Sequence, residues 1–130
     1  MPSDASIDHG LRRYVVLHHT GIDEPHFDLL FDTADDSPLI AFRVQHWPPI
    51  DQPATKLRDH RRLYLTYEGP IPGARGHVTR VADGRIKVIE TAAGWLLQHP
   101  DGRLFAALEL RGGLDSDQWW MTTPTEEIGA

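Results

Sequence analysis

The sequence contains no cysteine among its 130 residues, which excludes disulfides, thiolate zinc sites and cysteine nucleophiles and is typical of a reducing compartment. It also lacks an apolar run near the ~20 residues that a membrane-spanning helix needs. Residues 1–10 lack the basic start and apolar middle of a signal peptide. We therefore expect a cytoplasmic protein that has no membrane partner.

The sequence also has no excess of basic residues. The chain has 13 Lys and Arg against 19 Asp and Glu, a net charge of −6. This balance disfavours nonspecific coating of nucleic acid by the whole surface, but it allows one local patch to bind. Residues 56–62, KLRDHRR, carry four basic residues beside Asp59, and they form either such a patch or a solvated loop.

No window shows a capped amphipathic helix; short apolar, β-branched runs separated by turn signals fill the sequence instead. The expected strands are residues 13–19, 26–32, 39–45, 61–69, 76–82, 85–91, 94–99, 103–111 and 118–123. Turn spacing of about 8–12 residues is typical of antiparallel barrels and sandwiches. We predict an all-β fold, an antiparallel closed or nearly closed barrel of about eight short strands with little helix.

The predicted organisation is a single barrel domain between two tails. Residues 1–12 are expected to form a flexible N-terminal tail, residues 13–123 the barrel, and residues 124–130 a C-terminal tail. The proline-rich stretch 47–54 is not expected to form a central strand. The sequence Ala82-Asp83-Gly84-Arg85 predicts a turn.

Eight histidines are the first sign of chemistry. His26 and Asp28 lie two apart on an expected strand, so they share one face and lie within about 7 Å of each other. His19, at the end of the preceding strand, adds a third ligand. Two histidines and a carboxylate suit Mn, Fe or Zn, although a hydrogen-bonded surface histidine beside a solvated aspartate explains the same pair.

A second group of polar residues combines His60 and Tyr64 with neighbouring arginines. Arginine donates to a phosphate through two N–H groups, and a protonated histidine and a tyrosine each donate one hydrogen bond. The group therefore suits phosphate binding. The alternative is that Tyr64 packs on the barrel wall while the arginines lie in water.

The order of these motifs resembles a known family. The segments VVLHH…HFDLLF (15–31), DHRRLYLTYEGPIPGARG (59–76) and QWWMT (118–122) resemble the phosphoesterase module of bacterial DNA ligase D. This module is also called the DNA polymerase ligase N-terminal domain, and it occurs as stand-alone proteins. The resemblance covers about residues 13–122.

The resemblance implies a Mn²⁺-dependent β-barrel enzyme that removes a terminal ribonucleoside and then the 3′-phosphate. By motif position, His19, His26 and Asp28 would hold the metal, with His18 in reserve and Zn²⁺ or another divalent transition metal as alternatives to Mn²⁺. His60 and Tyr64 would be catalytic and engage the phosphate, together with Arg58 and Arg62. The expected partners are the 3′ ends of a DNA primer–template or of RNA-tipped DNA, and a DNA-repair ligase or polymerase.

The sequence departs from the family pattern in two places. The loop between His19 and His26 is one residue longer than usual, and Leu30 stands where the family has a phosphate-contacting arginine two residues after the aspartate. Four arginines are candidates to replace it: Arg43, Arg58, Arg62 and Arg80. We expect the metal to lie on the open side of the barrel.

Two further interpretations remain open. The chain is either an active enzyme on nucleic-acid ends or, because Leu30 replaces an arginine, a catalytically weak or inactive metal-containing module that binds such ends or repair partners. The acidic net charge also leaves open a phosphoesterase for a small nucleotide.

Overall fold

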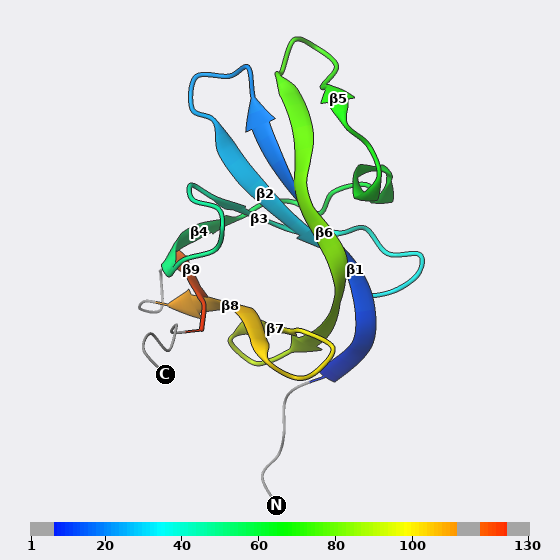
Figure 1. Ribbon diagram of the computed structural model, residues 1–130, viewed down its shortest axis with the longest axis vertical. Coiled ribbons are helices and arrows are strands. Elements are labelled where there is room, and N and C mark those ends of the chain that lie inside the picture. The colour runs from blue at the N-terminus through cyan, green and yellow to red at the C-terminus, as the bar shows by residue number, and fades with distance from the viewer. Residues whose placement is uncertain (1–6, 112–117, 125–130) are drawn as a thin grey trace, which may run out of the picture.

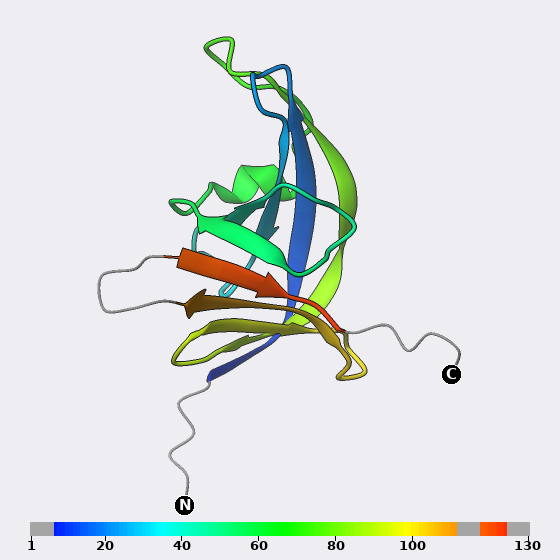
Figure 2. The same cartoon turned by 90° about the vertical axis from the view of Figure 1, so that its left-hand side faces the viewer.

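The computed structural model describes residues 7–111 and 118–124 and has the all-β architecture predicted from the sequence (Figures 1 and 2). The strands are β1 (Ile7–Thr20), β2 (His26–Phe31), β3 (Ile40–Val44), β4 (Gln52–Lys56), β5 (Gly69–Pro70), β6 (His77–Glu90), β7 (Gly94–Gln98), β8 (Leu104–Arg111) and β9 (Gln118–Thr122). One 3₁₀ turn, η1 (Arg62–Leu65), is the helical element of the described residues.

Eight of the strands close into an antiparallel barrel. They follow the order β1-β2-β3-β4-β9-β8-β7-β6, and β6 pairs back onto β1 to complete the ring. The short strand β5 lies outside the ring and pairs with the beginning of β6. In Figure 1, β1, β2 and β6 extend beyond the ring, and η1 and β5 lie beside this extension.

The alternation of side chains along the strands produces two separate apolar clusters. Val16, Leu29 and Phe42 belong to the cluster that fills the barrel, to which every strand of the ring contributes a buried or partly buried side chain. Their neighbours in sequence point to the opposite face of the sheet. That face carries a second cluster, here called the outer core: Val15, Leu17, Leu30, Leu39, Ala41, Leu65 and Val78.

The barrel prediction is confirmed, but the predicted strand boundaries are wrong in four places. The first is the N-terminal tail: β1 begins at Ile7 and pairs with β6 from that residue. Residues 7–12 therefore belong to the sheet. Residues 1–6 and 125–130, which make up most of the remainder of the predicted tails, lie outside the described residues.

The second difference concerns the turn predicted at residues 82–85. The structure has one continuous strand, β6, in place of two strands. Gly84 lies opposite Tyr14 of β1, and a Cβ atom at Gly84 would come within 3.2 Å of the tyrosine ring. The glycine here makes room for an aromatic ring across the ladder and does not reverse the chain.

The third difference is that residues 61–69 do not form a strand. The segment folds as η1, and Leu65 within it is only 5% exposed and packs in the outer core. Tyr64 and Tyr67 pack beside the same cluster. Covering this apolar face of the sheet has outweighed the β propensity of the tyrosines.

The fourth difference is β4, which the prolines of residues 47–54 were expected to prevent. Residues 52–54 pair with β9, whereas the ladder with β3 involves Thr55 and Lys56. Pro53 therefore lies outside the part of β4 that pairs with β3. Proline has no backbone N–H to donate to a neighbouring strand. Because the two ladders are staggered, β3 does not pair with β4 at Pro53, and the missing N–H is tolerated in this barrel strand.

No helix in the described part of the chain is long and apolar enough to cross a membrane.

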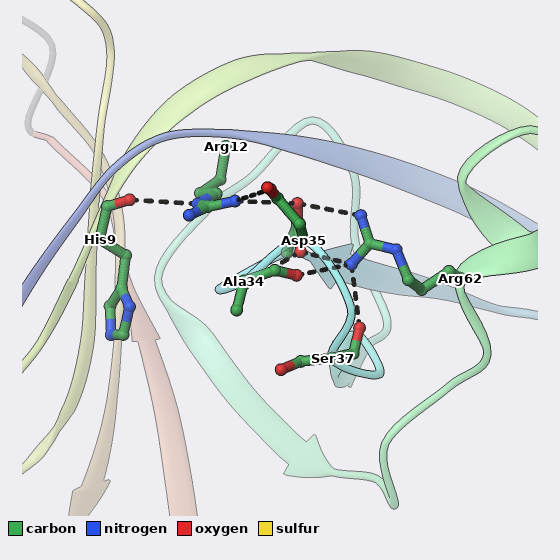
Figure 3. Close-up of polar contacts among 7 residues, drawn as sticks. His9, Arg12, Ala34, Asp35, Ser37 and Arg62 are labelled. Carbon is green, nitrogen blue, oxygen red and sulfur yellow. Dashed lines mark hydrogen bonds and ion pairs between the residues drawn. The ribbon is translucent and has the colours of Figure 1, made fainter.

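An ion-pair network fixes η1 to the connection between β2 and β3 (Figure 3). The guanidinium of Arg62 donates to both carboxylate oxygens of Asp32, at 2.6 and 3.2 Å, and to the carbonyl oxygens of Ala34 and Ser37. Arg12 contacts Asp32 at 3.7 Å and donates to Asp35 at 2.7 Å. The outer core and this network together hold the segment that carries His60 and Tyr64.

The Asp32–Arg62 pair predicts a pH-dependent stability. Burial raises the pKa of the Asp32 carboxyl, but the hydrogen bonds and charge of Arg62 outweigh burial and leave that pKa below its usual value. The carboxylate therefore stabilises the fold above its unfolded pKa of ~3.9, and this stabilisation is lost as the pH falls through the lower folded value.

We expect Arg62→Gln to lower the free energy of unfolding at pH 7 by about 2–3 kcal/mol, somewhat less than loss of one partner of a fully buried pair because Arg12 remains. The deficit should shrink as the pH falls below ~4. Urea unfolding from pH 3 to pH 8 measures both effects. Arg61→Gln, at an exposed neighbour, is the control. An equal loss in the control, or a deficit that does not depend on pH, would contradict the prediction.

Candidate metal centre

The three predicted metal ligands lie together on the outer face of the sheet. His19, the second-last residue of β1, is directly opposite His26, the first residue of β2, in the antiparallel ladder. Asp28 follows two residues later on the same face. One ligand atom from each of the three residues lies within 4.8 Å of the others. The structure thus brings the three side chains together, and their role as metal ligands stays a prediction.

The location of this group differs from the expected one. Leu29 and Phe31, which alternate with His26 and Asp28 along β2, point into the barrel core. The histidine and the aspartate therefore project from the outside of the barrel wall, towards the segment that contains η1, and the open side of the barrel is not involved. His18, the reserve ligand, alternates with His19, and its ring stacks on Phe27 at 4.4 Å, away from the group.

The hydrogen bonds of the two imidazoles define their tautomers. His26 Nδ1 lies 2.9 Å from the carbonyl oxygen of Glu24, and His19 Nε2 lies 2.7 Å from that of Arg75. A carbonyl oxygen only accepts, so both of these nitrogens carry a hydrogen. In the neutral rings, the remaining nitrogens, His19 Nδ1 and His26 Nε2, are bare.

These bare nitrogens face each other at 3.1 Å, with the nearer carboxylate oxygen of Asp28 3.7 Å from His26 Nε2. Two lone pairs repel each other at this distance unless a cation lies between them. Nitrogens bound to one metal ion at about 2.1 Å lie roughly 3.0–3.4 Å apart for angles of about 90–109°. The donor set and the distance between the two nitrogens therefore fit a single divalent ion.

The surroundings favour the neutral, metal-binding form of His26. His26 and Asp28 are each 5% exposed. Burial lowers the pKa of His26, and the negative charge of Asp28 only partly offsets the effect. Asp28 also accepts a hydrogen bond from Arg43 Nε at 3.2 Å. Contacts of this kind orient a ligand and tune its metal affinity.

A close backbone approach holds His19 in place. The carbonyl that accepts from its Nε2 belongs to Arg75, and the next residue, Gly76, has φ +92°. A Cβ atom on Gly76 would lie 2.4 Å from the carbonyl oxygen of Thr20 and 2.9 Å from His19 Nε2. The turn between β5 and β6 reaches the histidine only because this position has no side chain.

We expect Gly76→Ala to weaken metal binding roughly 10- to 100-fold, the usual effect of losing a contact that orients a metal-binding histidine. The control is Gly102→Ala, whose φ of +94° is nearly the same but whose Cβ would meet nothing within 4 Å. Both variants carry similar backbone strain, so a Mn²⁺ titration isolates the effect of the close contacts at Gly76, with Thr20 and with His19. Equal affinities in the two variants would show that the close approach is unimportant.

A cavity of about 200 Å³ lies next to two of the three predicted ligands, His19 and Asp28. Its polar lining comes from both sides of the site: His19, Asp28 and Arg43 on the sheet, and His60, Tyr64 and Arg75 on the segment that covers it. Three apolar residues complete it: Leu17, Ile71 and Val78. The volume is below the ~300 Å³ of the smallest pockets for drug-sized ligands, so it accommodates a terminal group of a larger molecule.

His60 is fixed with one nitrogen available for chemistry. Its backbone bridges to Leu39 through two hydrogen bonds, and its Nδ1 donates to the carbonyl oxygen of Arg58 at 3.0 Å. The other nitrogen, Nε2, therefore accepts a proton when the ring is neutral and donates one when it is charged. The ring lies 5.8 Å from that of Tyr64, edge to face.

The structure separates the predicted phosphate-binding residues into two groups. His60 and Tyr64 line the cavity, but Arg58 and Arg62 are not among its lining residues, and Arg62 binds Asp32 instead. Arg43 and Arg75 line the cavity in their place. Arg43 was one of four candidates in the sequence; Arg75 was not singled out, because nothing in the sequence indicates that its turn folds back onto His19.

Leu30 stands at the sequence position where the family that the chain resembles has an arginine, and its side chain does not line the cavity. It lies on the same face as His26 and Asp28, as expected, but it is completely buried in the outer core.

No protein-family model matches this sequence, and no curated protein matches it. The resemblance described above therefore stays an expectation that rests on the motifs themselves.

Proposed function

We propose that this protein is a metal-dependent phosphoesterase that removes terminal groups, a 3′-ribonucleoside and then a 3′-phosphate, from the ends of DNA or RNA-tipped DNA during repair. The observation that carries the proposal is the pair of bare imidazole nitrogens, 3.1 Å apart beside a buried carboxylate. His19 and Asp28 border a cavity that is also lined by His60, Tyr64 and two arginines. This combination suits a divalent cation and a phosphoryl group in adjacent positions.

His19, His26 and Asp28 would hold the ion, with Mn²⁺ as the expected metal and Zn²⁺ or another divalent transition metal as alternatives. A bound ion would supply Lewis acidity to a phosphoryl group and lower the pKa of a coordinated water molecule. The protein contributes the orientation of both rings through the carbonyl oxygens of Arg75 and Glu24.

The residues across the cavity would bind the phosphate and move the proton. Tyr64 donates a hydrogen bond to a phosphoryl oxygen. His60, charged in the complex, donates its Nε2 proton to the 3′ oxygen as the P–O3′ bond breaks. A new bond forms between phosphorus and a water oxygen, and the water releases a proton to solvent. Inorganic phosphate and a 3′-hydroxyl end result.

The size and charge of the site favour a chain end over a free nucleotide. A cavity of about 200 Å³ holds a terminal phosphate and leaves the rest of the substrate outside. Two arginines line it, although the whole chain has a net charge of −6. Binding would therefore be local to the end and only moderately dependent on salt.

The test is a Mn²⁺ titration by calorimetry, followed by an assay of phosphate release from a 3′-phosphorylated primer–template. We expect one metal site and release of phosphate that depends on the metal and on His60. His99→Gln, at a partly buried histidine beside Phe105, is the control and should behave as the wild type.

The second candidate function is a binding module without turnover, which Leu30 at the position of the family's arginine favours. Metal binding without phosphate release, even at high protein concentration, would reject the enzyme and support the module. Absence of metal binding would reject both.

A further inference from the structure

We propose that Arg43, on β3, is the arginine that binds the substrate phosphate in this protein. This inference rests on the proposed function and names a residue for it. The position two residues after Asp28 cannot serve, because Leu30 there is buried in the outer core. A guanidinium must therefore reach the cavity from another strand.

The register of the sheet places Arg43 beside the metal ligands. One row of residues crosses four strands on the outer face: Arg80 on β6, Leu17 on β1, Asp28 on β2 and Arg43 on β3. Asp28 and Arg43 are direct partners in the ladder, and Arg43 Nε donates to Asp28 Oδ1 at 3.2 Å. The guanidinium thus lies next to the ion site and borders the cavity.

This contact leaves the phosphate-binding side of the guanidinium available. The hydrogen bond to Asp28 occupies Nε of Arg43. Within the described residues, no partner is seen for its two terminal nitrogens. The side chain is 36% exposed. Because the hydrogen bond to Asp28 limits rotation of the planar group, the terminal N–H groups are oriented in advance, which suits a paired contact with phosphate oxygens.

Two of the other arginines are held elsewhere. Arg62 is bound by Asp32 and two carbonyl oxygens, and Arg80 pairs with Glu68 and Asp83. Arg58 is not among the residues that line the cavity. Arg75 also lines the cavity, and its Nε donates to the carbonyl oxygen of Pro72, so its side chain is held by its own turn and not by a metal ligand. Arg43 alone among them is on the sheet next to a metal ligand.

The experiment compares one primer–template with a 3′-phosphate and with a 3′-hydroxyl end, by fluorescence anisotropy with protein treated with a chelator. Binding without metal gives a readout that does not depend on turnover. The wild type should prefer the phosphorylated end. Arg43→Gln should lose about 10- to 100-fold in that preference, as expected for a charge-assisted paired contact. Arg43→Lys should regain part of it.

Arg80→Gln is the matched control, since it removes the arginine at the other end of the same row, and it should keep the preference. Mn²⁺ affinity provides the second readout. We expect it to change less than about threefold in Arg43→Gln, because the amide nitrogen of glutamine stands at the same position along the side chain as Arg43 Nε and can donate to Asp28 in its place. Asp28 then keeps its orienting partner, whose loss would cost ~10–100-fold. A parallel loss of metal affinity and phosphate preference that Arg43→Lys does not repair would show that Arg43 only positions Asp28.

The outcomes separate this inference from the proposed function. A phosphate preference that depends on Arg43, in a protein that releases no phosphate with metal, supports Arg43 and rejects hydrolysis. Phosphate release that persists unchanged in Arg43→Gln overturns the assignment while hydrolysis stands. A loss that appears in Arg75→Gln and not in Arg43→Gln also overturns it.

Discussion

A His26→Gln variant is expected to bind Mn²⁺ roughly 100-fold or more weakly than the wild type, because loss of a ligand exceeds the ~10–100-fold effect of losing a contact that orients one. The same variant should lose phosphate release. His26 is nearly fully buried, and its Nε2 faces His19 Nδ1 at 3.1 Å. Glutamine has a similar length but cannot present a ring nitrogen to the ion.

The metal-free protein should respond in the opposite direction. With its tautomers fixed by the carbonyl oxygens of Glu24 and Arg75, the wild type places two lone pairs against each other. The amide of a glutamine at position 26 can donate to His19 Nδ1 and remove this repulsion. We therefore expect metal-free His26→Gln to be no less stable than the metal-free wild type, as is common when a binding site is strained without its ligand.

Thermal unfolding with and without Mn²⁺ measures both effects. At 100 times its dissociation constant, the metal should stabilise the wild type by about 2.7 kcal/mol, or roughly 10 °C in Tm for a domain of this size. His26→Gln should show no such shift. His77→Gln, at an exposed histidine at the start of β6, is the control and should keep it. A full metal shift in His26→Gln would remove the basis of the proposed site.

The sequence predicted those parts of the molecule that depend on local patterns. Alternation along residues 26–31 correctly placed His26, Asp28 and Leu30 on one face, since the two-residue period holds in any strand. Repeated turn signals correctly predicted an antiparallel barrel. The structure adds that His19 is the direct ladder partner of His26, which explains how a loop one residue longer than the family's still brings the two rings together.

The parts that sequence reasoning missed depend on contacts between distant segments. Nothing local indicates that the outer face of β1, β2 and β3 is apolar enough to require a cover, and so the packing of Leu65 on Leu30 was not foreseen. The pairing of Asp28 with Arg43 depends on the length and course of the β2–β3 connection. Gly84 was read as part of a turn because only the structure shows the Tyr14 ring that faces it.

Leu30→Arg, which would place an arginine where the family that the sequence resembles has one, is expected to destabilise the protein by about 4 kcal/mol or more. Truncation of a buried leucine to alanine already costs ~2–5 kcal/mol, and burial of an unpaired charge costs several more. Leu30 is 0% exposed and packs with Leu17, Leu39 and Leu65 between the sheet and η1. A domain with a typical stability of ~5–15 kcal/mol would lose the docking of η1 or unfold.

Two variants show whether the cause is burial of charge. Leu30→Met, which nearly conserves volume, should cost less than ~1.5 kcal/mol, and Leu110→Arg, at a residue that is 43% exposed on β8, should change stability by no more than ~0.5 kcal/mol. Urea unfolding monitored by tryptophan fluorescence measures all three. The contrary outcome is a folded Leu30→Arg protein that releases phosphate faster than the wild type. It would mean that the outer core tolerates a buried charge and that the guanidinium at position 30 reaches the cavity. The argument that the phosphate-binding arginine must come from β3 would then be wrong, because an arginine at position 30 of β2 could play the role proposed for Arg43.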